Sequence, residues 1–220
     1  MPLYVVATPI GNLEDMTLRA LRTLQEADLI AAEDTRHSRK LLARYEIKTP
    51  LISFHEHSTE SRIESLIERL RNGETIALIT DGGTPGVSDP GAKLVLAALS
   101  EGLTVSPLPG PSAVSAALSV SGFAAQFYRF LGFLPRKDGQ QRAIFEQYKD
   151  EPGPVVFFES PYRIGKTLAN ALSALGDRPV AVCREMTKQH EEIYRGMLAQ
   201  AVEKFSAPDQ KGEFTVVIGR

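Results

Sequence analysis

Short apolar runs alternate with amphipathic segments along the first half of the chain. The apolar runs predict strands at residues 3–7, 29–32, 51–54, 75–80 and 103–108. Between them, apolar side chains recur at helical spacing, as in Ile63, Leu66, Ile67 and Leu70, and predict helices near residues 18–24, 35–45, 63–70, 93–100 and 112–121. Strands that alternate with helices in this way predict a mainly parallel sheet with helices on both faces.

The second half contains strands that follow one another more closely. They are expected at residues 127–133, 154–158, 179–183, 191–196 and 213–219, with helices near residues 140–148, 164–175 and 198–205. Such closely spaced strands favour antiparallel pairing, so this half is predicted to form a separate α+β unit. The segment PLPGPS is the expected hinge, which divides the chain into an N-terminal α/β domain, residues 1–110, and a C-terminal α+β domain, residues 111–220.

Composition and charge limit the possible partners. The chain has 220 residues, 43% hydrophobic and 24% charged, which is typical of a globular protein. Its formal net charge of −2 argues against general attraction to nucleic acid or membrane, although a local basic patch remains possible. Cys183 is the only cysteine, which excludes an internal disulfide and favours a reducing compartment. The apolar N-terminal run is too short for a signal peptide or a membrane span, so we expect a cytoplasmic protein with no membrane association.

A segment rich in glycine and proline, ALITDGGTPGVSDPG, includes the fourth predicted strand and the loop after it. Loops at the carboxyl ends of strands form the ligand crevice of open α/β sheets. Two more strand ends, ATPIGN and PLPGPSAV, share this composition, which suggests a ligand held by backbone groups. Tight crossover turns would use the same residues. The loop has neither the Walker nor the dinucleotide glycine pattern, so phosphate binding is not supported.

Seven short motifs occur in order over nearly the whole chain. They are ATPIGNLEDMTLRAL, AEDTR, FHEH, DGGTPGVSDPG, PGPSAV, FFESPYRI and REMTK. This set resembles the small-subunit ribosomal RNA methyltransferases of the tetrapyrrole-methylase-like class. The resemblance implies two α/β domains with a cleft for S-adenosylmethionine between them, a homodimer, and 2′-O-methylation of a cytidine in the decoding region of 16S rRNA within the small ribosomal subunit.

Family members usually continue into a helical C-terminal extension, whereas this sequence ends at Gly219-Arg220. We therefore expect the extension to be absent. A chain without it is expected to keep its cofactor site but to bind RNA less well.

The resemblance also implies a set of cofactor contacts in the glycine-rich loops and in one strand. They are Pro9, Asp81, Gly82, Gly83, Thr84, Val87, Ser112, Ala113 and Phe158. Glycine at positions 82 and 83 would let the main chain meet the methionine moiety, and amides near Ser112 would bind its carboxylate. Ser112 is equally well explained as a helix N-cap, and Phe158 as a core residue of a strand.

Methyl transfer to a ribose hydroxyl requires that the hydroxyl be oriented and its proton removed. The candidates for these tasks are Glu33, Asp34, Arg36, His55, Glu56 and Glu159. His55 and His57 stand two residues apart at a predicted strand end, which would place both rings on one face, as in a metal site. Because the sequence offers no evident third ligand, we predict no metal.

Basic residues recur at helical spacing after AEDTR. Arg36, Arg39, Lys40 and Arg44 form a stripe that is the first candidate for contacts with RNA phosphates, and Arg136 with Lys137 is the second. A solvated helix face has the same composition. Three other functions remain open: a tetrapyrrole-precursor methylase, a phosphoryl-transfer enzyme and a non-catalytic RNA-binding module.

Overall fold

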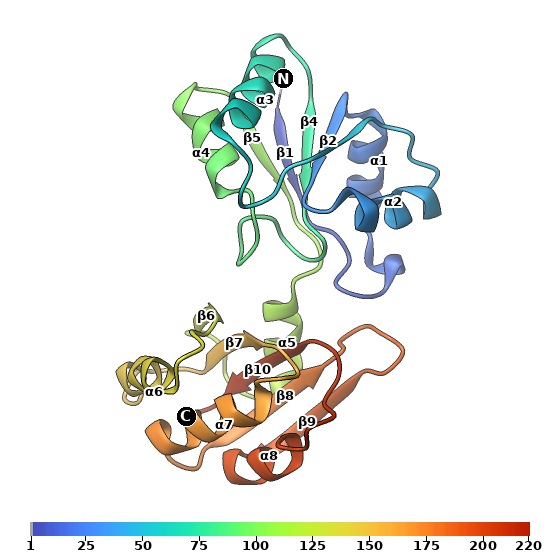
Figure 1. The fold of residues 1–220 in the computed structure, drawn as a ribbon. Coiled ribbons are helices and arrows are strands. Elements are labelled where there is room, and N and C mark those ends of the chain that lie inside the picture. Colours follow the sequence, from blue (N-terminus) through green and yellow to red (C-terminus); the bar gives the residue numbers. More distant parts are fainter. Residues whose placement is uncertain (1) are drawn as a thin grey trace. The chain divides into compact units, whose positions relative to one another are not determined.

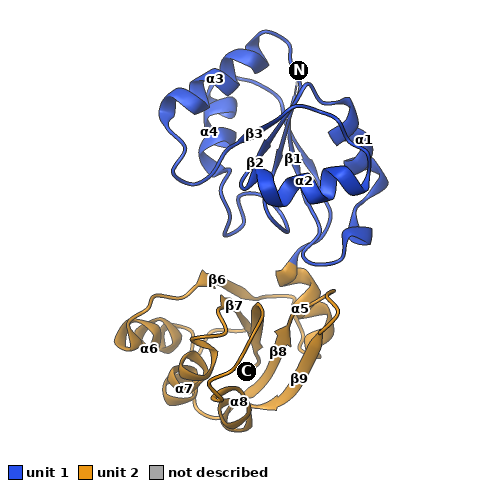
Figure 2. Ribbon diagram, turned by 45° about the vertical axis from the view of Figure 1, so that its right-hand side comes forward, with its two compact units in different colours: residues 1–112 blue, residues 113–220 orange. Residues whose placement is uncertain are grey.

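A computed structural model describes residues 2–220, which form two compact units (Figure 1, Figure 2). Unit 1 ends at Ser112 and unit 2 begins at Ala113. The division lies two residues beyond the one placed on sequence grounds, at residue 110, because the helix that starts at Ala113 packs on the second sheet.

Unit 1 is built on a five-stranded sheet in the order β3-β2-β4-β1-β5, in which every pair is parallel. Its strands are β1 (Leu3–Val6), β2 (Leu29–Ala32), β3 (Leu51–Ser53), β4 (Ile76–Ile79) and β5 (Val105–Leu108). Its helices are α1 (Leu18–Glu26), α2 (Thr35–Arg44), α3 (Glu60–Arg71) and α4 (Ala92–Ser100), with a 3-10 turn η1 (Leu13–Asp15). All the predicted strands and helices of this half are confirmed, and only η1 was not predicted.

The central strands of unit 1 are buried on both faces. In β2, Leu29 and Ala31 pack in a core with α3 and α4, whereas Ile30 and Ala32 pack in a second core with α1 and α2. The same alternation runs through β4. A strand covered on both faces needs an unbroken apolar run, which explains why these two strands carry no polar side chain.

The strand order creates a switch point in the middle of the sheet. β1 and β4 are neighbours, and Leu3 pairs with Ile76. The chain leaves β1 through α1 towards β2, and it leaves β4 through α4 on the other face towards β5. Because the two connections run in opposite directions, the carboxyl ends of β1 and β4 flank the position where open α/β sheets bind ligands.

Unit 2 carries a five-stranded mixed sheet in the order β6-β7-β10-β8-β9. Its strands are β6 (Arg129–Phe133), β7 (Val155–Glu159), β8 (Pro179–Arg184), β9 (Glu192–Met197) and β10 (Phe214–Ile218). Its helices are α5 (Ala113–Ser121), α6 (Asp138–Gln147), α7 (Ile164–Leu175) and α8 (Leu198–Phe205). Helices α6, α7 and α8 cover one face in a core that includes Phe145, Phe157 and Phe205. Helix α5 contacts β8 and β10.

One strand pair of unit 2 departs from the predicted antiparallel pattern. β7, β8, β9 and β10 pair antiparallel, but β6 pairs parallel with β7. Helix α6 lies between β6 and β7 in the chain, and a connection through a helix lets the second strand return in the same direction as the first.

Cys183 lies in β8 and is fully buried. Burial raises the pKa of its thiol to about 11, so the thiol stays protonated at neutral pH.

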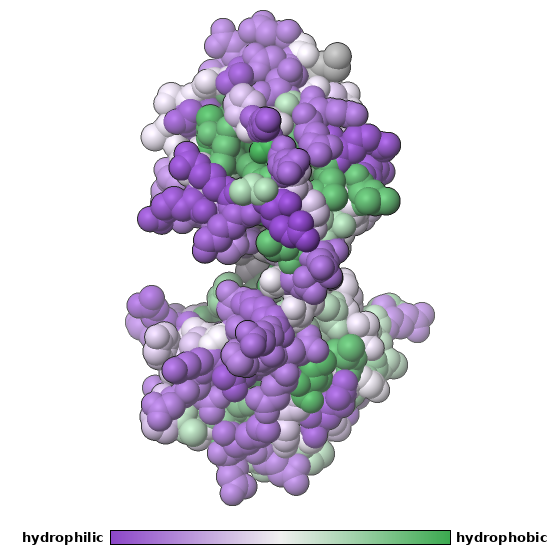
Figure 3. Space-filling view, turned by 90° about the vertical axis from the view of Figure 1, so that its right-hand side faces the viewer, coloured by the Kyte–Doolittle hydropathy of each residue, from purple (hydrophilic) through white to green (hydrophobic). Residues whose placement is uncertain are grey.

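Hydrophilic side chains cover much of each unit in the view of Figure 3, with apolar patches between them. The large exposed apolar side chains of unit 2 are Phe127, Tyr128, Phe133 and Tyr162. Within residues 2–220, no helix has the length and apolar character needed to cross a bilayer.

Two glycines at equivalent helix positions make a test of the packing in unit 2. A Cβ atom on Gly165, the second residue of α7, would lie 2.7 Å from Ser206 Cα and 2.8 Å from the Phe205 oxygen, at the end of α8. A Cβ on Gly139, the second residue of α6, would meet nothing within 4 Å. We expect Gly165→Ala to lower the free energy of unfolding by about 1–3 kcal/mol through overpacking.

The matched control is Gly139→Ala. It should leave stability unchanged or raise it by up to about 1 kcal/mol, because alanine loses less conformational entropy in a helix. Urea unfolding of both variants measures the difference, and equal effects would contradict the close packing of α7 on α8.

Candidate functional site

Two loops meet at the switch point through a pair of backbone hydrogen bonds. The Thr8 amide donates to the Gly83 carbonyl at 2.9 Å, and the Gly83 amide donates to the Thr8 carbonyl at 2.9 Å. The buried Thr8 hydroxyl also donates to the Thr80 carbonyl at 3.1 Å. The loops after β1 and β4 are therefore held as one short antiparallel bridge.

The third glycine- and proline-rich loop joins the same edge. The Thr84 hydroxyl donates to the Pro111 carbonyl at 3.4 Å. A Cβ on Gly110 would lie 3.1 Å from the Ala7 Cβ, so this loop packs closely on the end of β1. The first two loops, and the third as far as Ser112, thus lie together in unit 1. They carry seven of the nine predicted cofactor residues: Pro9, Asp81, Gly82, Gly83, Thr84, Val87 and Ser112. The other two, Ala113 and Phe158, belong to unit 2.

Local packing and backbone geometry explain why glycine occupies these positions of the long loop, without any ligand. A Cβ on Gly82 would lie 3.1 Å from the Pro9 carbonyl oxygen. Gly83 has a φ of +92°, and Gly91 combines a φ of +137° with a Cβ position 2.9 Å from the Leu78 side chain. Side chains at these positions would strain the backbone or separate the loops. Close approach of the cofactor is therefore not needed to explain glycine at 82 or 83.

Acidic side chains link the ends of β2 and β4. The Asp81 amide donates to Glu33 Oε2 at 3.4 Å, and the Asp34 amide donates to Asp81 Oδ1 at 3.2 Å. Asp34 also caps α2 by accepting the Arg36 amide at 2.8 Å. The Arg36 guanidinium binds both oxygens of Asp34, at 2.8 and 3.2 Å. Three predicted catalytic residues, Glu33, Asp34 and Arg36, are therefore brought together.

The carboxyl groups at this edge have different pKa values. The Arg36 guanidinium holds the pKa of Asp34 well below its usual range. Burial raises the pKa of Glu33, and the charges of Asp81 and Asp34 add to that effect. Burial, together with the charges of Glu33 and Asp81, raises the pKa of Asp89 to about 7. Asp89 is therefore partly protonated at neutral pH, and sequence reasoning gave it no role.

His55, Glu56 and His57 lie in an exposed turn. Strand β3 ends at Ser53, so the two histidines are not on a strand end as predicted, and their ring centroids are 6.4 Å apart. His55 lies near Glu33, and a positive charge on its ring would offset part of the rise in the Glu33 pKa that burial causes. Glu56 forms a loose ion pair with Lys93 at 3.8 Å. In the part of the chain that the structure describes, no group of three or more histidine, cysteine or acidic residues is arranged to hold a metal ion.

Glu159 and Phe158 lie in β7 of unit 2. Glu159 is buried and accepts hydrogen bonds from the Thr167 hydroxyl at 2.7 Å and from the Ser160 amide at 2.8 Å. The Arg163 guanidinium pairs with it at 3.2 Å. These contacts give Glu159 a structural role within unit 2. Phe158 is half-buried, and its ring centroid lies 5.0 Å from that of Phe130.

Helix α2 presents the predicted basic stripe to solvent. Arg36, Arg39, Lys40 and Arg44 are all exposed, whereas Ser38, Leu41 and Leu42 face the core. Arg36 is ion-paired with Asp34. Among residues 2–220, Arg39, Lys40 and Arg44 form no ion pair, so these three residues carry the available charge of this face, and the Arg44 guanidinium lies over the Tyr45 ring at 5.6 Å. Arg136 and Lys137 are exposed where α6 begins in unit 2.

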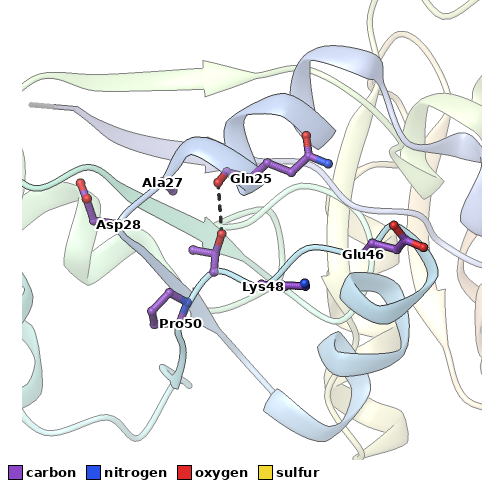
Figure 4. Close-up of a pocket in the computed structure, with 7 residues that line it drawn as sticks. Gln25, Ala27, Asp28, Glu46, Lys48 and Pro50 are labelled. Carbon is purple, nitrogen blue, oxygen red and sulfur yellow. Dashed lines mark hydrogen bonds between the residues drawn. The ribbon is translucent and has the colours of Figure 1, made fainter.

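A groove in unit 1 lies away from these residues (Figure 4). It is lined by Gln25, Ala27, Asp28, Glu46, Lys48, Thr49 and Pro50. These residues precede β2 and β3, so the groove is at the amino edge of the sheet, opposite the three loops. The Thr49 hydroxyl donates to the Leu24 carbonyl at 2.6 Å and to the Gln25 carbonyl at 3.5 Å, which ties the two connections together. None of the predicted site residues lines this groove.

The family model named Tetrapyrrole (Corrin/Porphyrin) Methylases matches residues 2–202. The chain therefore belongs to this family of methyltransferases. Among its relatives, Ribosomal RNA small subunit methyltransferase I of Halalkalibacterium halodurans is 49% identical over 216 residues, which cover 98% of this chain and 75% of the relative. The protein of the same name from Thermotoga maritima is 47% identical over 98% of this chain and 97% of its own length. These names confirm the resemblance read from the motifs.

Solved structures with the same fold include diphthine synthase and cobalt precorrin-4 methyltransferase. Diphthine synthase has a TM-score of 0.74 at 15% identity, over 99% of this chain and 89% of that chain. Cobalt precorrin-4 methyltransferase has a TM-score of 0.72 at 18% identity, over 99% and 94% of the two chains. These likenesses confirm the predicted tetrapyrrole-methylase-like α/β fold.

The raised pKa of Asp89 predicts a pH-dependent stability. Its pKa in the folded protein, about 7, lies above the ordinary aspartate pKa of 3.8 that an unfolded chain would show. The stability that protonated Asp89 contributes is therefore complete below the unfolded value and is lost as the pH rises through about 7. We expect Asp89→Asn to raise the free energy of unfolding relative to the natural protein at about pH 8, and to do so less at about pH 4.

Urea unfolding at both pH values measures this difference. Asp209→Asn is the matched control, because Asp209 is exposed, and it should behave alike at the two pH values. A pH-independent effect of Asp89→Asn would mean that the Asp89 carboxyl ionises normally.

Proposed function

We propose that the protein transfers a methyl group from S-adenosylmethionine to the 2′-oxygen of a cytidine ribose in the decoding region of 16S rRNA. The observation that carries this proposal is the identity of 49% over 98% of the chain to a relative named Ribosomal RNA small subunit methyltransferase I. The choice of the 2′-oxygen and of cytidine rests on the motif resemblance.

The three loops of unit 1 suit a cationic cofactor held by backbone groups. A solved neighbour of the same fold, uroporphyrin-III C-methyl transferase from Thermus thermophilus, is complexed with S-adenosyl homocysteine; its TM-score is 0.68 at 19% identity over 99% of this chain and 97% of that chain. Asp81 is exposed at the switch point, and its carboxylate would attract the cofactor's ammonium or sulfonium charge. The remaining contacts would come from Pro9, Gly82, Gly83, Thr84 and Val87, and from Ser112, Ala113 and Phe158.

When bound, S-adenosylmethionine supplies a methyl group on a positively charged sulfur. The protein's own residues then have two tasks, which are to orient the ribose hydroxyl and to receive its proton. Asp34 is a poor proton acceptor because Arg36 neutralises it. Glu33 is half-buried with a raised pKa and is a better one. His55 and Glu56 are exposed and would contact the RNA from the turn after β3.

The RNA would be held mainly by the basic face of α2. This face begins next to Glu33 and Asp34, so phosphate contacts there would bring a ribose towards the acidic edge. We propose Arg39 and Lys40 as the principal phosphate contacts, with Arg36 and Arg44 beside them. Arg136 and Lys137 in unit 2 form a second candidate track.

The proposed substrate implies where in the cell the reaction takes place. An enzyme that methylates 16S rRNA would act in the cytoplasm, on RNA within the small ribosomal subunit. We also propose a homodimer, which light scattering distinguishes from a monomer of 24.1 kDa. A tetrapyrrole-precursor methylase of the same fold is the second candidate, because cobalt precorrin-4 methyltransferase is a structural neighbour, but its 18% identity supports the fold alone.

The cofactor proposal predicts that bulk at Val87 blocks binding. Its side chain is 43% exposed in the long loop, so a larger residue can be placed there without disturbing the packing that Gly82 and Gly83 require. We expect Val87→Trp to weaken S-adenosylmethionine binding by at least about tenfold, or 1.4 kcal/mol, in calorimetry. Leu99→Trp, at an exposed position of α4, is the control and should bind normally. Unchanged affinity in folded Val87→Trp would remove this loop from the cofactor site.

The RNA proposal predicts a selective effect of charge reversal on α2. Arg39→Glu combined with Lys40→Glu should leave S-adenosylmethionine affinity intact, reduce methylation of small-subunit RNA strongly, and lower the salt slope of RNA binding by about two units. Arg22→Glu combined with Lys48→Glu is the control, because both residues are exposed and the net charge changes equally. If the α2 variant methylates RNA at the normal rate, the basic stripe does not bind RNA and is only a solvated helix face. Mass mapping of the product identifies the methylated ribose.

A further inference from the structure

Three phenylalanine rings gather at the β6 edge of the unit 2 sheet (Figure 2). Leu131 of β6 and Phe157 of β7 pack in the core under α6, α7 and α8, so that face of the edge is covered. Phe158 lies on the opposite face, because side chains alternate along a strand. Its ring centroid is 5.0 Å from that of Phe130 and 5.5 Å from that of Phe133. We call Phe130, Phe133 and Phe158 the aromatic cluster.

An irregularity in β6 brings Phe133 into this cluster. Phe130 pairs with Val156, and Phe133 pairs with Phe158, so β6 has one residue more than β7 between the two pairs. In a regular strand, residues 130 and 133 would face opposite sides. The extra residue puts both on one side, and Gly132 adopts the positive φ of +61° that this bulge uses. Phe133 is 61% exposed, so the bulge presents an aromatic ring to solvent.

The turn after β6 is held in place by hydrogen bonds from two other segments. The Arg163 guanidinium donates to the Leu134 carbonyl at 2.7 Å and to the Pro135 carbonyl at 2.8 Å. The Gln141 side-chain amide donates to the Pro135 carbonyl at 2.7 Å. Arg163 ends the turn after β7, in which the neighbouring Tyr162 is 92% exposed. The bulge of β6 and the exposed Tyr162 ring thus belong to two segments that are bonded to each other.

Two cations follow in the same turn. Arg136 and Lys137 are exposed, and neither forms an ion pair with a residue in the described range 2–220. The acid next to them, Asp138, is already paired with Lys166 at 3.0 Å. The turn beside the aromatic cluster therefore carries available positive charge.

Exposed rings next to available cations are the features with which proteins bind single-stranded nucleic acid. Unpaired bases stack on aromatic side chains, while arginine and lysine contact the phosphates. Three residues of chain span at most about 11 Å, so a nucleotide on Phe133 has a phosphate near Arg136. A second copy of this chain would have to place acidic groups against Arg136 and Lys137, whereas RNA supplies a phosphate at every nucleotide. The charge therefore favours RNA as the occupant.

We propose that the β6 edge of unit 2 binds unpaired nucleotides of the RNA substrate, with one base stacked on Phe133 and the adjoining phosphates on Arg136 and Lys137. Tyr162 offers a second ring for another base. This inference rests on the proposed function and deepens it, because stacking makes the second phosphate track selective for an unpaired strand. Phe158 packs against the Phe133 ring and keeps its proposed place among the cofactor contacts.

The first test compares variants with and without a ring at position 133, in the full chain and without S-adenosylmethionine. Phe133→Ala should weaken the binding of a single-stranded oligocytidylate by about 5–150-fold, the loss expected for one stacked base. Phe133→Tyr keeps the ring and should bind as the natural protein does. Phe127→Ala is the matched control, because Phe127 is 59% exposed in the same unit and, within residues 2–220, its ring contacts no ring of the cluster.

An abasic oligomer of the same length separates stacking from charge. It keeps the phosphates, so the natural protein and Phe133→Ala should bind it equally. Arg136→Glu combined with Lys137→Glu should weaken the binding of both oligomers and lower the salt slope by about 1.4 units, or about 0.7 for each phosphate contact of a single strand.

Fluorescence reports the stacked base directly. The chain contains no tryptophan, so Phe133→Trp introduces a single indole ring at the proposed stacking position. A base stacked on this ring quenches its emission, so oligocytidylate should quench Phe133→Trp and the abasic oligomer should not. Phe127→Trp should be quenched by neither oligomer.

The outcomes separate this inference from the proposed function. It is overturned if folded Phe133→Ala binds oligocytidylate as tightly as the natural protein does, or if the natural protein does not bind it. If Phe133→Ala lowers the mass in light scattering and keeps its RNA affinity, the cluster joins two copies of the chain, which also overturns the inference. None of these measurements involves methyl transfer. A natural protein that binds RNA through Phe133 but methylates no ribose of 16S rRNA would contradict the proposed function alone.

Discussion

Two backbone hydrogen bonds between Thr8 and Gly83 organise the carboxyl edge of unit 1. Loops rich in glycine have many conformations to lose, so a crossover loop of this composition is poorly defined by itself. The bridge joins two such loops, and the close approach of Gly82 to the Pro9 carbonyl leaves no slack between them. A ligand at the switch point therefore meets a preorganised frame, and little ordering entropy remains to oppose its binding.

Much of the fold could be predicted because buried strands and helix faces require apolar residues at regular positions in the sequence. β2 and β4 are covered on both faces, and their short apolar runs LIAA and IALI, each set between helical segments, favour strands of a two-sided sheet. The parallel pairing of β6 with β7 was missed, because pairing direction depends on where the chain returns. The glycines of the long loop were ambiguous for a similar reason: the sequence shows glycine at position 82 but not the Pro9 carbonyl that requires it. The environment of Asp89 depends on Glu33 and Asp81, which only the fold brings near it.

Opposite charges lie close together on unit 1 without cancelling. Arg36 neutralises Asp34 locally, so the acidic character of the edge comes from Glu33 and Asp81. The basic character of α2 comes from the residues further along the helix. Because salt screens exposed charges beyond about 8–10 Å, the nearest charges dominate the potential at each position. A protein with a net charge of −2 can thus attract a cation and a polyanion at neighbouring positions of one unit.

The burial of Cys183 makes the thiol a natural reporter of local opening. A protonated thiol in the middle of a sheet does not react with alkylating reagents, so labelling requires that unit 2 open. Since the chain has no other cysteine, opening of unit 1 exposes no thiol and produces no alkylation. The rate of alkylation therefore follows the opening of unit 2 alone, and comparison with global unfolding separates the stabilities of the two units without any added label.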